Sequence, residues 1–437
     1  MLRAAGATAS EIAASLEKTL NTGHPAQGDV LPTVRALARH LSVSPATVAA
    51  AYKLLRLRGL TTGSGRRGTR VAPRPLMASV AASYVPDAAV DLASGNPDPA
   101  LLPPLETAMR AVGSGSPVLY GGSHAEKALL AFAANEFDAD GIPSRSTTVV
   151  SGALDALDRI LREHVRAGDR VAVEDPSFPG ITDLVTAAGC IPTPVPLDEH
   201  GPLPDAVDEA VRRGCRAIVV TPRAQNPTGA AIDKARSADL RRVLRRSPDV
   251  VVVENDYMAP IAGAPIFPIR AGPHERWAVI RSTSKFLGPD LRVALLAGDE
   301  LTVSRVERRQ ALGVRWVSRL LQQLVLALWS DPSSGRRLAR ATDIYARRRQ
   351  ALQTALATEG IAVAARSGFN VWIAVHDERS VVHALADRGW AVAAGDRFRM
   401  RAGPGVRVTA SMLEPPDAGR FAADLAQAVR QSGSMLA

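Results

Sequence analysis

Apolar residues recur at helical spacing through the first part of the chain, and two short extended segments follow them. Thr8 and Glu11 have the spacing of a capping box, and Ser44-Pro45 supplies an N-cap serine with proline at the first helical position. Gly59 ends the third helix, and a glycine-rich stretch joins the strands predicted at 60–62 and 69–71. The inward positions of the three predicted helices are Ile12, Leu16 and Leu20, then Val34, Leu37 and Leu41, then Val48, Tyr52 and Leu55.

Three short helices and a two-stranded tip predict a winged helix-turn-helix in residues 1–72. The third helix is thin on its outer face, at Ala46, Thr47 and Ala50, so it can enter a major groove. Arg66 and Arg67, at the glycine-rich tip, can reach phosphates or a minor groove. A helical domain that only contacts other proteins is the alternative. Eleven Lys/Arg against three Asp/Glu in residues 1–74, within a net charge of +10, favour DNA.

Residues 73–90, rich in proline and small residues, are expected to be a linker, and residues 91–437 form the second domain. There, helical segments alternate with short β-branched runs. This alternation predicts an α/β fold, with a mostly parallel sheet covered by helices on both faces. Ligands of such folds bind beyond the carboxyl ends of the strands. The runs are 148–150, 170–173, 217–221, 250–253 and 278–280.

Lys285 stands behind Ser282 and Ser284 and seven residues before Arg292. A lysine amine becomes a nucleophile at neutral pH when burial or a neighbouring cation lowers its pKa. Hydroxyls and a guanidinium bind a phosphate. A lysine beside a phosphate pocket describes pyridoxal 5'-phosphate (PLP) held by its own protein. A solvated lysine in a Ser/Thr-rich loop is the alternative. Ala153 and Leu154 begin a helix directly after a strand, so their backbone amides are further phosphate donors.

Other features exclude several classes of protein. No apolar run approaches the roughly 18–20 residues of a membrane span, and the N-terminus lacks the pattern of a secretory signal. Two cysteines offer no disulfide framework, so we expect a cytoplasmic protein. The eight histidines show no metal-ligand spacing, so no metal site is expected. We interpret Arg347-Arg348-Arg349 as a solvated helix face rather than a second DNA site.

The N-terminal segment resembles the GntR family of DNA-binding regulators over nearly all of residues 8–72. The resemblance is carried by Leu31-Pro32-Thr33-Val34-Arg35-Ala36-Leu37-Ala38, by Val43-Ser44-Pro45-Ala46-Thr47-Val48, by Ala51-Tyr52 and by the glycine-rich wing. It implies that Arg35, Ser44 and Thr47 contact double-stranded DNA.

The remainder resembles fold-type-I aminotransferases, which implies a small C-terminal α+β subdomain besides the large sheet. Lys285 matches the residue that forms the Schiff base with PLP, and Ser282, Ser284 and Arg292 match its phosphate ligands. The other matching positions are Phe178 (ring stacking), Asn226 in Asn-Pro-Thr-Gly and Tyr257 (both toward the phenolic O3'), and Arg407 (substrate carboxylate).

A GntR-like domain before an aminotransferase-like domain is the layout of the MocR subfamily of bacterial regulators. The resemblance implies a head-to-tail homodimer in the bacterial cytoplasm, associated with the nucleoid when bound to its operator. It also implies that PLP, another vitamin B6 compound, an amine or an amino acid changes DNA binding. A working aminotransferase with an ancillary DNA-binding domain is the main alternative. A third possibility is a DNA-binding protein whose large domain has lost the cofactor and serves as a dimerisation scaffold.

Two positions depart from the family pattern. The family usually has Glu-Asp-Asp-Tyr where this chain has Glu254-Asn255-Asp256-Tyr257. Adjacent strand residues face opposite ways, so either Asn255 faces the pyridine nitrogen or a bulge delivers Asp256 there. An asparagine can hydrogen-bond to the nitrogen without keeping it protonated, which predicts poor turnover with PLP binding intact. Tyr120, the expected phosphate contact across the dimer, is followed by Gly121-Gly122-Ser123-His124 instead of the usual glycine spacing.

Overall fold

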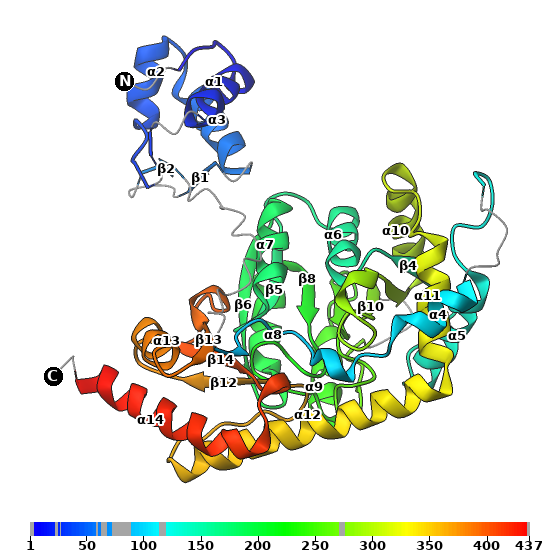
Figure 1. The fold of residues 1–437 in the computed structure, drawn as a ribbon. Coiled ribbons are helices and arrows are strands. Elements are labelled where there is room, and N and C mark those ends of the chain that lie inside the picture. The colour runs from blue at the N-terminus through cyan, green and yellow to red at the C-terminus, as the bar shows by residue number, and fades with distance from the viewer. Residues whose placement is uncertain are drawn as a thin grey trace. The chain divides into compact units, whose positions relative to one another are not determined.

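The computed structural model describes residues 4–21, 25–26, 28–57, 60–62, 68–71, 89–112, 119–270 and 276–434, drawn as a ribbon in Figure 1. The chain divides into two compact units, the first of which contains residues 1–81. Arg66, Arg67 and nearly all of the expected linker lie outside the described residues. Within those residues, no helix is both long and apolar enough to cross a membrane.

The N-terminal unit is a three-helix domain with a small antiparallel hairpin. Thr8 and Glu11 exchange hydrogen bonds at the start of the first helix, as the capping box predicts. Ser44 caps the third helix by accepting from the N–H of Thr47, and Tyr52 donates to the carbonyl of Pro32 at 2.7 Å. The predicted inward residues form its core. The elements are α1 (Ala9–Asn21), α2 (Val34–Leu41), α3 (Pro45–Leu57), β1 (Thr61–Thr62) and β2 (Arg70–Val71).

The second unit is built on an eight-stranded sheet of order β4-β11-β10-β9-β8-β5-β6-β7. Strands β5, β8, β9 and β10 run parallel to one another, whereas β11 pairs antiparallel with β10 and β4. The mostly parallel sheet predicted from the β-branched runs is therefore confirmed. The strands are β4 (Thr147–Val150), β5 (Arg170–Asp175), β6 (Ile191–Asp198), β7 (Gly201–Pro202), β8 (Cys215–Val220), β9 (Val251–Asn255), β10 (Trp277–Ser282) and β11 (Ala294–Gly298).

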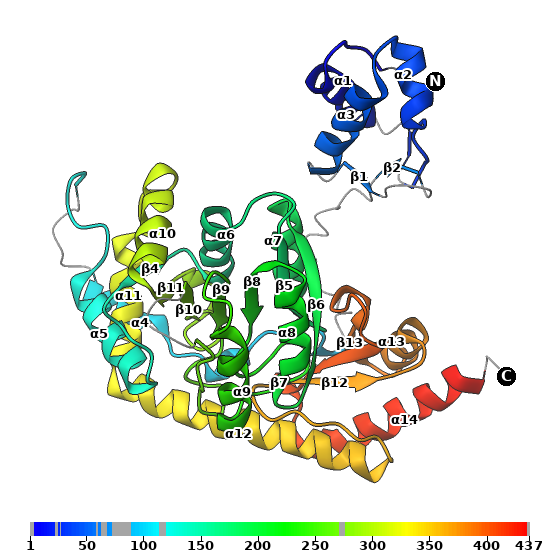
Figure 2. The same cartoon turned by 180° about the vertical axis from the view of Figure 1, so that it is seen from behind.

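Helices lie on both sides of this sheet (Figure 2). Apolar side chains of β5, β8, β9 and β10 share a core with residues of the flanking helices, such as Phe137, Leu240 and Val325. The helices are α4 (Leu105–Val112), α5 (Lys127–Ala139), α6 (Ala153–His164), α7 (Pro179–Ala187), α8 (Pro204–Arg212), α9 (Lys234–Leu244), α10 (Glu300–Leu312) and α11 (Arg319–Ser330).

A smaller C-terminal lobe contains a four-stranded sheet of order β12-β14-β13-β3. Its first strand comes from far upstream, because β3 pairs parallel with β13. The long α12 joins the lobes, since Tyr345 belongs to the core of the large sheet and Leu352 to that of the small one. The elements are β3 (Val90–Leu92), α12 (Pro332–Thr358), β12 (Asn370–Ala374), α13 (Glu378–Ala386), β13 (Trp390–Ala394), β14 (Gly405–Thr409) and α14 (Ala418–Ser434).

The interpretation of the arginine run on α12 as a solvated face is wrong for two of its three residues. Arg348 is buried and pairs with Asp98 at 2.8 Å and with Glu414. Arg349 is buried as well and donates to the carbonyl of Gly368. Both residues therefore join segments of the second unit and are not available to DNA.

Candidate functional site

Lys285 lies in the loop after β10, at the carboxyl edge of the large sheet. Its amine is part-buried and donates to the carbonyl of Gly95 at 2.7 Å. Burial and, to a smaller extent, the positive charge of Arg407 lower the pKa of Lys285 to about 8. About a tenth of the amine is therefore neutral at pH 7, and this is the form in which a lysine is a nucleophile.

A phosphate-binding arrangement surrounds the start of α6. Gly152 has φ +99°, and a Cβ there would lie 2.6 Å from a guanidinium nitrogen of Arg292, so this guanidinium packs against the helix start. The N-cap residue Gly152 has no side chain to cap α6, which leaves its first N–H groups, those of Ala153 and Leu154, available to an anion. Ser282 donates to Ser284 at 3.2 Å. The two hydroxyls therefore lie together at the carboxyl end of β10, where the loop that carries Lys285 begins.

Arg407 lies on β14 and approaches the site from the C-terminal lobe. Its guanidinium donates to the carbonyl of Ala93 and, at 3.4 Å, to Asn226, and it stacks over the ring of Phe398. It is 4% exposed, and burial lowers its pKa to about 10, against Tyr257 and Asp91, which raise it. None of its contacts in the described residues is an ion pair, so this buried cation is available to pair with the carboxylate of a ligand.

Tyr257 and Asn226 lie on the same side of the site as Arg407. The Tyr257 hydroxyl donates to the carbonyl of Ala224 at 2.7 Å. Burial raises the pKa of Tyr257, against the nearby positive charge of Arg407, so the phenol remains a donor at neutral pH. The Phe178 ring lies against Gly180, where a Cβ would come within 2.7 Å of it and 3.3 Å of Leu154. The ring therefore packs beside the start of α6.

Asp256, which was expected among the cofactor ligands, has its carboxylate occupied by two buried arginines instead. The pairing of β9 runs in continuous register to Asn255 with β10 and to Glu254 with β8, and neither register contains the bulge that would turn Asp256 around. Asp256 is fully buried and accepts from Arg223 at 2.7 Å and from Arg281 at 3.0 Å. Burial alone would raise the pKa of Asp256, but these two arginines hold it below its usual range.

Asn255 is left with an unused acceptor. Its Oδ1 is buried and has no hydrogen-bond partner among the described residues. Buried polar atoms without partners are uncommon, and a ligand donor such as a pyridinium N–H would satisfy this one. The residues present thus fit PLP at four points: a lysine of lowered pKa, a cradle for an anion, a phenol donor and an orphan acceptor.

Tyr120 is brought together with none of these residues within the described part of this single chain. It is 80% exposed and contacts Trp316 and Arg315. In the N-terminal unit, Arg35 and Ser44 are exposed and Thr47 is half-buried. The Ser44 and Thr47 hydroxyls lie 2.8 Å apart, so both are at the N-terminal end of the third helix.

Two elements of the site carry no local sequence motif and were not predicted. One element is the 93–95 segment, which supplies carbonyls to Arg407 and Lys285. Gly95 has φ +71° and no side chain, and a Cβ there would lie 3.1 Å from the Arg407 guanidinium, so glycine allows this close approach. The second element is Glu174, a buried carboxyl whose pKa burial raises to about 8, against hydrogen bonds from Thr221 and Gln225. Position at the end of β5 was the only signal for Glu174.

Two family models match the chain, and they match different parts of it. Residues 8–71 match the bacterial regulatory proteins of the gntR family, and residues 88–425 match aminotransferase class I and II. The chain therefore belongs to the class I and II aminotransferase family, in the MocR arrangement that places a gntR domain first. It is a DNA-binding transcription regulator, and the cofactor of its large domain is PLP.

Among curated proteins, the chain is 39% identical to the vitamin B6 salvage pathway transcriptional repressor PtsJ of Salmonella typhimurium, covering 98% of this chain and 99% of PtsJ. It is 24% identical to the pyridoxine biosynthesis regulator PdxR of Corynebacterium glutamicum, covering 79% and 78% of the two chains. A similar solved structure is the α-aminoadipate aminotransferase LysN of Thermus thermophilus, complexed with N-(5'-phosphopyridoxyl)-L-leucine. Its TM-score is 0.69 at 22% identity, covering 80% of this chain and 94% of LysN.

Proposed function

We propose that this regulator senses PLP itself, bound as a Schiff base through Lys285, and that occupancy of this site changes its affinity for an operator. The observation that carries the proposal is the part-buried Lys285 amine, whose pKa burial lowers to about 8, beside the anion cradle of Arg292 and α6. The name of PtsJ, a repressor of vitamin B6 salvage at 39% identity over nearly the whole chain, supports a B6 compound as effector.

Each residue of the site has a proposed part. When bound, PLP supplies a reactive aldehyde and an electron-withdrawing ring. Arg292 and the α6 amides would hold its phosphate, and Asn255 would accept at the ring nitrogen. Asn226 would donate toward O3', and Tyr257 would do so by turning its hydroxyl proton away from the carbonyl of Ala224. Arg407 holds the carboxylate of any amino acid that enters. In the N-terminal unit, Arg35, Ser44 and Thr47 contact DNA, within the proposed limits of 1–72, 73–90 and 91–437 for domain, linker and domain.

We also propose a homodimer with the head-to-tail arrangement of the family. Large apolar side chains are exposed on α4 and α10, in the segments that follow them and at the start of α11. Tyr120, after α4, packs edge-on against Trp316, after α10, at a centroid distance of 5.6 Å. Exposed apolar surface of this kind is typical of an interface between protein chains. The exposed side chains include Met109 (61%), Leu119 (75%), Leu312 (81%), Val314 (61%) and Leu320 (65%). Because its partner is DNA, we place the protein in the bacterial cytoplasm, at the nucleoid when bound.

Footprinting on the DNA upstream of the protein's own coding region tests the proposal. PLP, pyridoxal and a panel of amino acids would be added in turn, and we expect PLP to change the footprint. A footprint indifferent to every ligand would defeat the sensing role. An effect of amino acids alone would move the effector from PLP to an amine.

A working aminotransferase remains the second candidate, because the structural neighbours include aminotransferases. Asn255 argues against efficient turnover, since an amide does not hold a proton on the ring nitrogen as a carboxylate does. Incubation with an amino donor and a keto acid separates the two functions. Many turnovers per protomer would favour the enzyme, and no more than one half-reaction per protomer would favour the regulator.

A further inference from the structure

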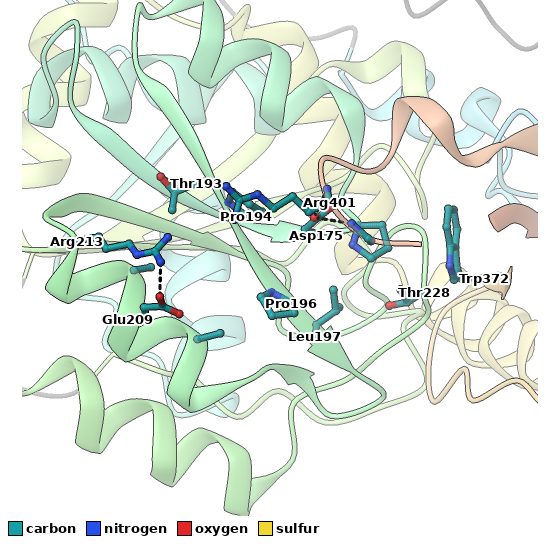
Figure 3. A pocket seen from close by; sticks show the side chains of 14 residues that line it. Asp175, Thr193, Pro194, Pro196, Leu197, Glu209, Arg213, Thr228, Trp372 and Arg401 are labelled. Atoms are coloured by element: carbon teal, nitrogen blue, oxygen red, sulfur yellow. Dashed lines mark hydrogen bonds and ion pairs between the residues drawn. The ribbon is translucent and has the colours of Figure 1, made fainter. Parts of the chain in front are cut away.

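A cavity of about 530 Å³ lies on the edge of the large sheet, on the far side of the Asn226–Thr228 turn from Arg407. Figure 3 shows that its walls come from β6, from α8 and from the C-terminal lobe. A volume of this size is typical of small-molecule sites. The apolar part of the wall consists of Pro176, Pro194, Pro196, Leu197, Ala206 and Ala210.

The C-terminal lobe contributes a fixed aromatic wall, Trp372. A Cβ on Gly395 or on Gly405 would lie 2.3 Å from the indole, so the ring lies directly on the backbone of these glycines. Its far edge faces Phe398 at a centroid distance of 6.4 Å, and Phe398 in turn lies beneath Arg407. One aromatic layer therefore separates the cavity from the carboxylate-binding arginine, which makes it a distinct site.

Two acidic and two basic side chains line the cavity, and Arg401 is the cation whose guanidinium has no partner among the residues that the structure describes. Glu209 is already paired with Arg213 at 2.5 Å. The carboxylate of Asp175 accepts three backbone N–H groups, those of Met400, Arg401 and Ala402, at 2.7–2.9 Å. The Arg401 guanidinium makes no hydrogen bond or ion pair with the residues that the structure describes, and its side chain extends toward β6 (Figure 3).

Asp175 anchors the loop that carries Arg401. It is 5% exposed, and its hydrogen bonds tie the loop that carries Arg401 to the end of β5. Ser177 adds a second tie by donating to the carbonyl of Phe398 at 2.7 Å. The backbone of Arg401 is therefore held by buried contacts between the two lobes, and its exposed side chain extends from this anchored loop.

We propose that this cavity is a second ligand site, which takes a small carboxylate with an aromatic body and pairs the carboxylate with Arg401. One free guanidinium matches one carboxylate through two parallel hydrogen bonds. The proline walls and the indole suit an apolar ring. A dianionic phosphate fits less well, because its second charge would lose water without gaining a partner. The site is separate from the PLP pocket, so the proposal stands or falls independently of the proposed sensing role.

Calorimetric titration of the PLP-loaded full chain with 2-naphthoate tests the site. We expect saturation in the millimolar range or below, and the uncharged 2-naphthamide should bind on the order of tenfold more weakly. Arg401→Gln should weaken naphthoate binding by a similar factor, whereas Arg379→Gln, a matched exposed arginine on α13, should leave it unchanged. Ala206→Trp, which fills the cavity, should abolish binding.

Arg407→Gln locates the ligand. We expect this variant to retain naphthoate binding, because Arg407 does not line the cavity and lies over the Phe398 ring instead. Loss of binding in Arg407→Gln with retention in Arg401→Gln and Ala206→Trp would assign naphthoate to the amino acid site and overturn the proposal. The proposal would also be overturned if the wild-type chain did not saturate at a naphthoate concentration 10-fold above about 1 mM, a dissociation constant at the weak limit of specific binding.

Discussion

The lowered pKa of Lys285 predicts how fast the cofactor-free protein takes up PLP at each pH. Only the neutral amine attacks an aldehyde. With the pKa at about 8, roughly a tenth of the amine is neutral at pH 7. A lysine of ordinary pKa, 10.5, would have about 300-fold less neutral amine at that pH. The rate of uptake should therefore rise with pH, with a midpoint at about pH 8, and then level off. This midpoint lies two units or more below that of a solvated lysine.

The assay follows absorption near ~420 nm, where a Schiff base of this cofactor absorbs, after mixing with stripped protein at each pH. Nα-acetyl-lysine is the reference amine. Burial is the larger cause of the lowered pKa and Arg407 the smaller, so Arg407→Met should move the midpoint upward without restoring 10.5. A rate that climbs steadily to pH 10 in the wild-type protein would refute the reasoning.

Three further predictions concern residues elsewhere in the chain. Asp256→Asn should lower the free energy of unfolding by about 3–5 kcal/mol in urea titrations, because two buried arginines lose their shared carboxylate; a change below 1 kcal/mol would contradict the buried pairing. The raised pKa of Glu174, about 8, favours folding below pH 4.5 and loses that effect as pH rises through 8, so Glu174→Gln should flatten the fall of Tm over this window. Arg35→Ala should weaken operator binding and reduce the slope of log K against log salt by about 1 in fluorescence anisotropy, and an unchanged slope would remove Arg35 from the phosphate contacts.

Periodicity and caps were sufficient to predict the N-terminal domain. Its helices depend on local signals such as Thr8-x-x-Glu11 and Ser44-Pro45, and its core residues follow directly from their spacing. The large sheet was also predictable, because parallel strands buried on both faces are apolar throughout. The motif around Lys285 predicted Ser282, Ser284 and Arg292 as phosphate ligands; in the structure the two serines are hydrogen-bonded and Arg292 packs against the start of α6.

Long-range contacts were not predictable in this way. The direction of Asp256 depends on Arg223 and Arg281, two residues whose approach only the folded sheet determines. Arg348 and Arg349 have the sequence pattern of a solvated face, yet their partners come from segments distant in the chain. The carbonyl of Gly95 reaches Lys285 across 190 residues, and no local pattern marks a backbone acceptor.

The central claim is that occupancy of Lys285 by PLP is communicated to the DNA-binding domain. The most direct measurement compares operator affinity of the wild-type chain and Lys285→Ala, each with and without PLP, at one fixed salt concentration. We predict that PLP changes the affinity of the wild-type protein and leaves that of Lys285→Ala unaltered. Equal responses of the two proteins, or no response in either, would contradict the account.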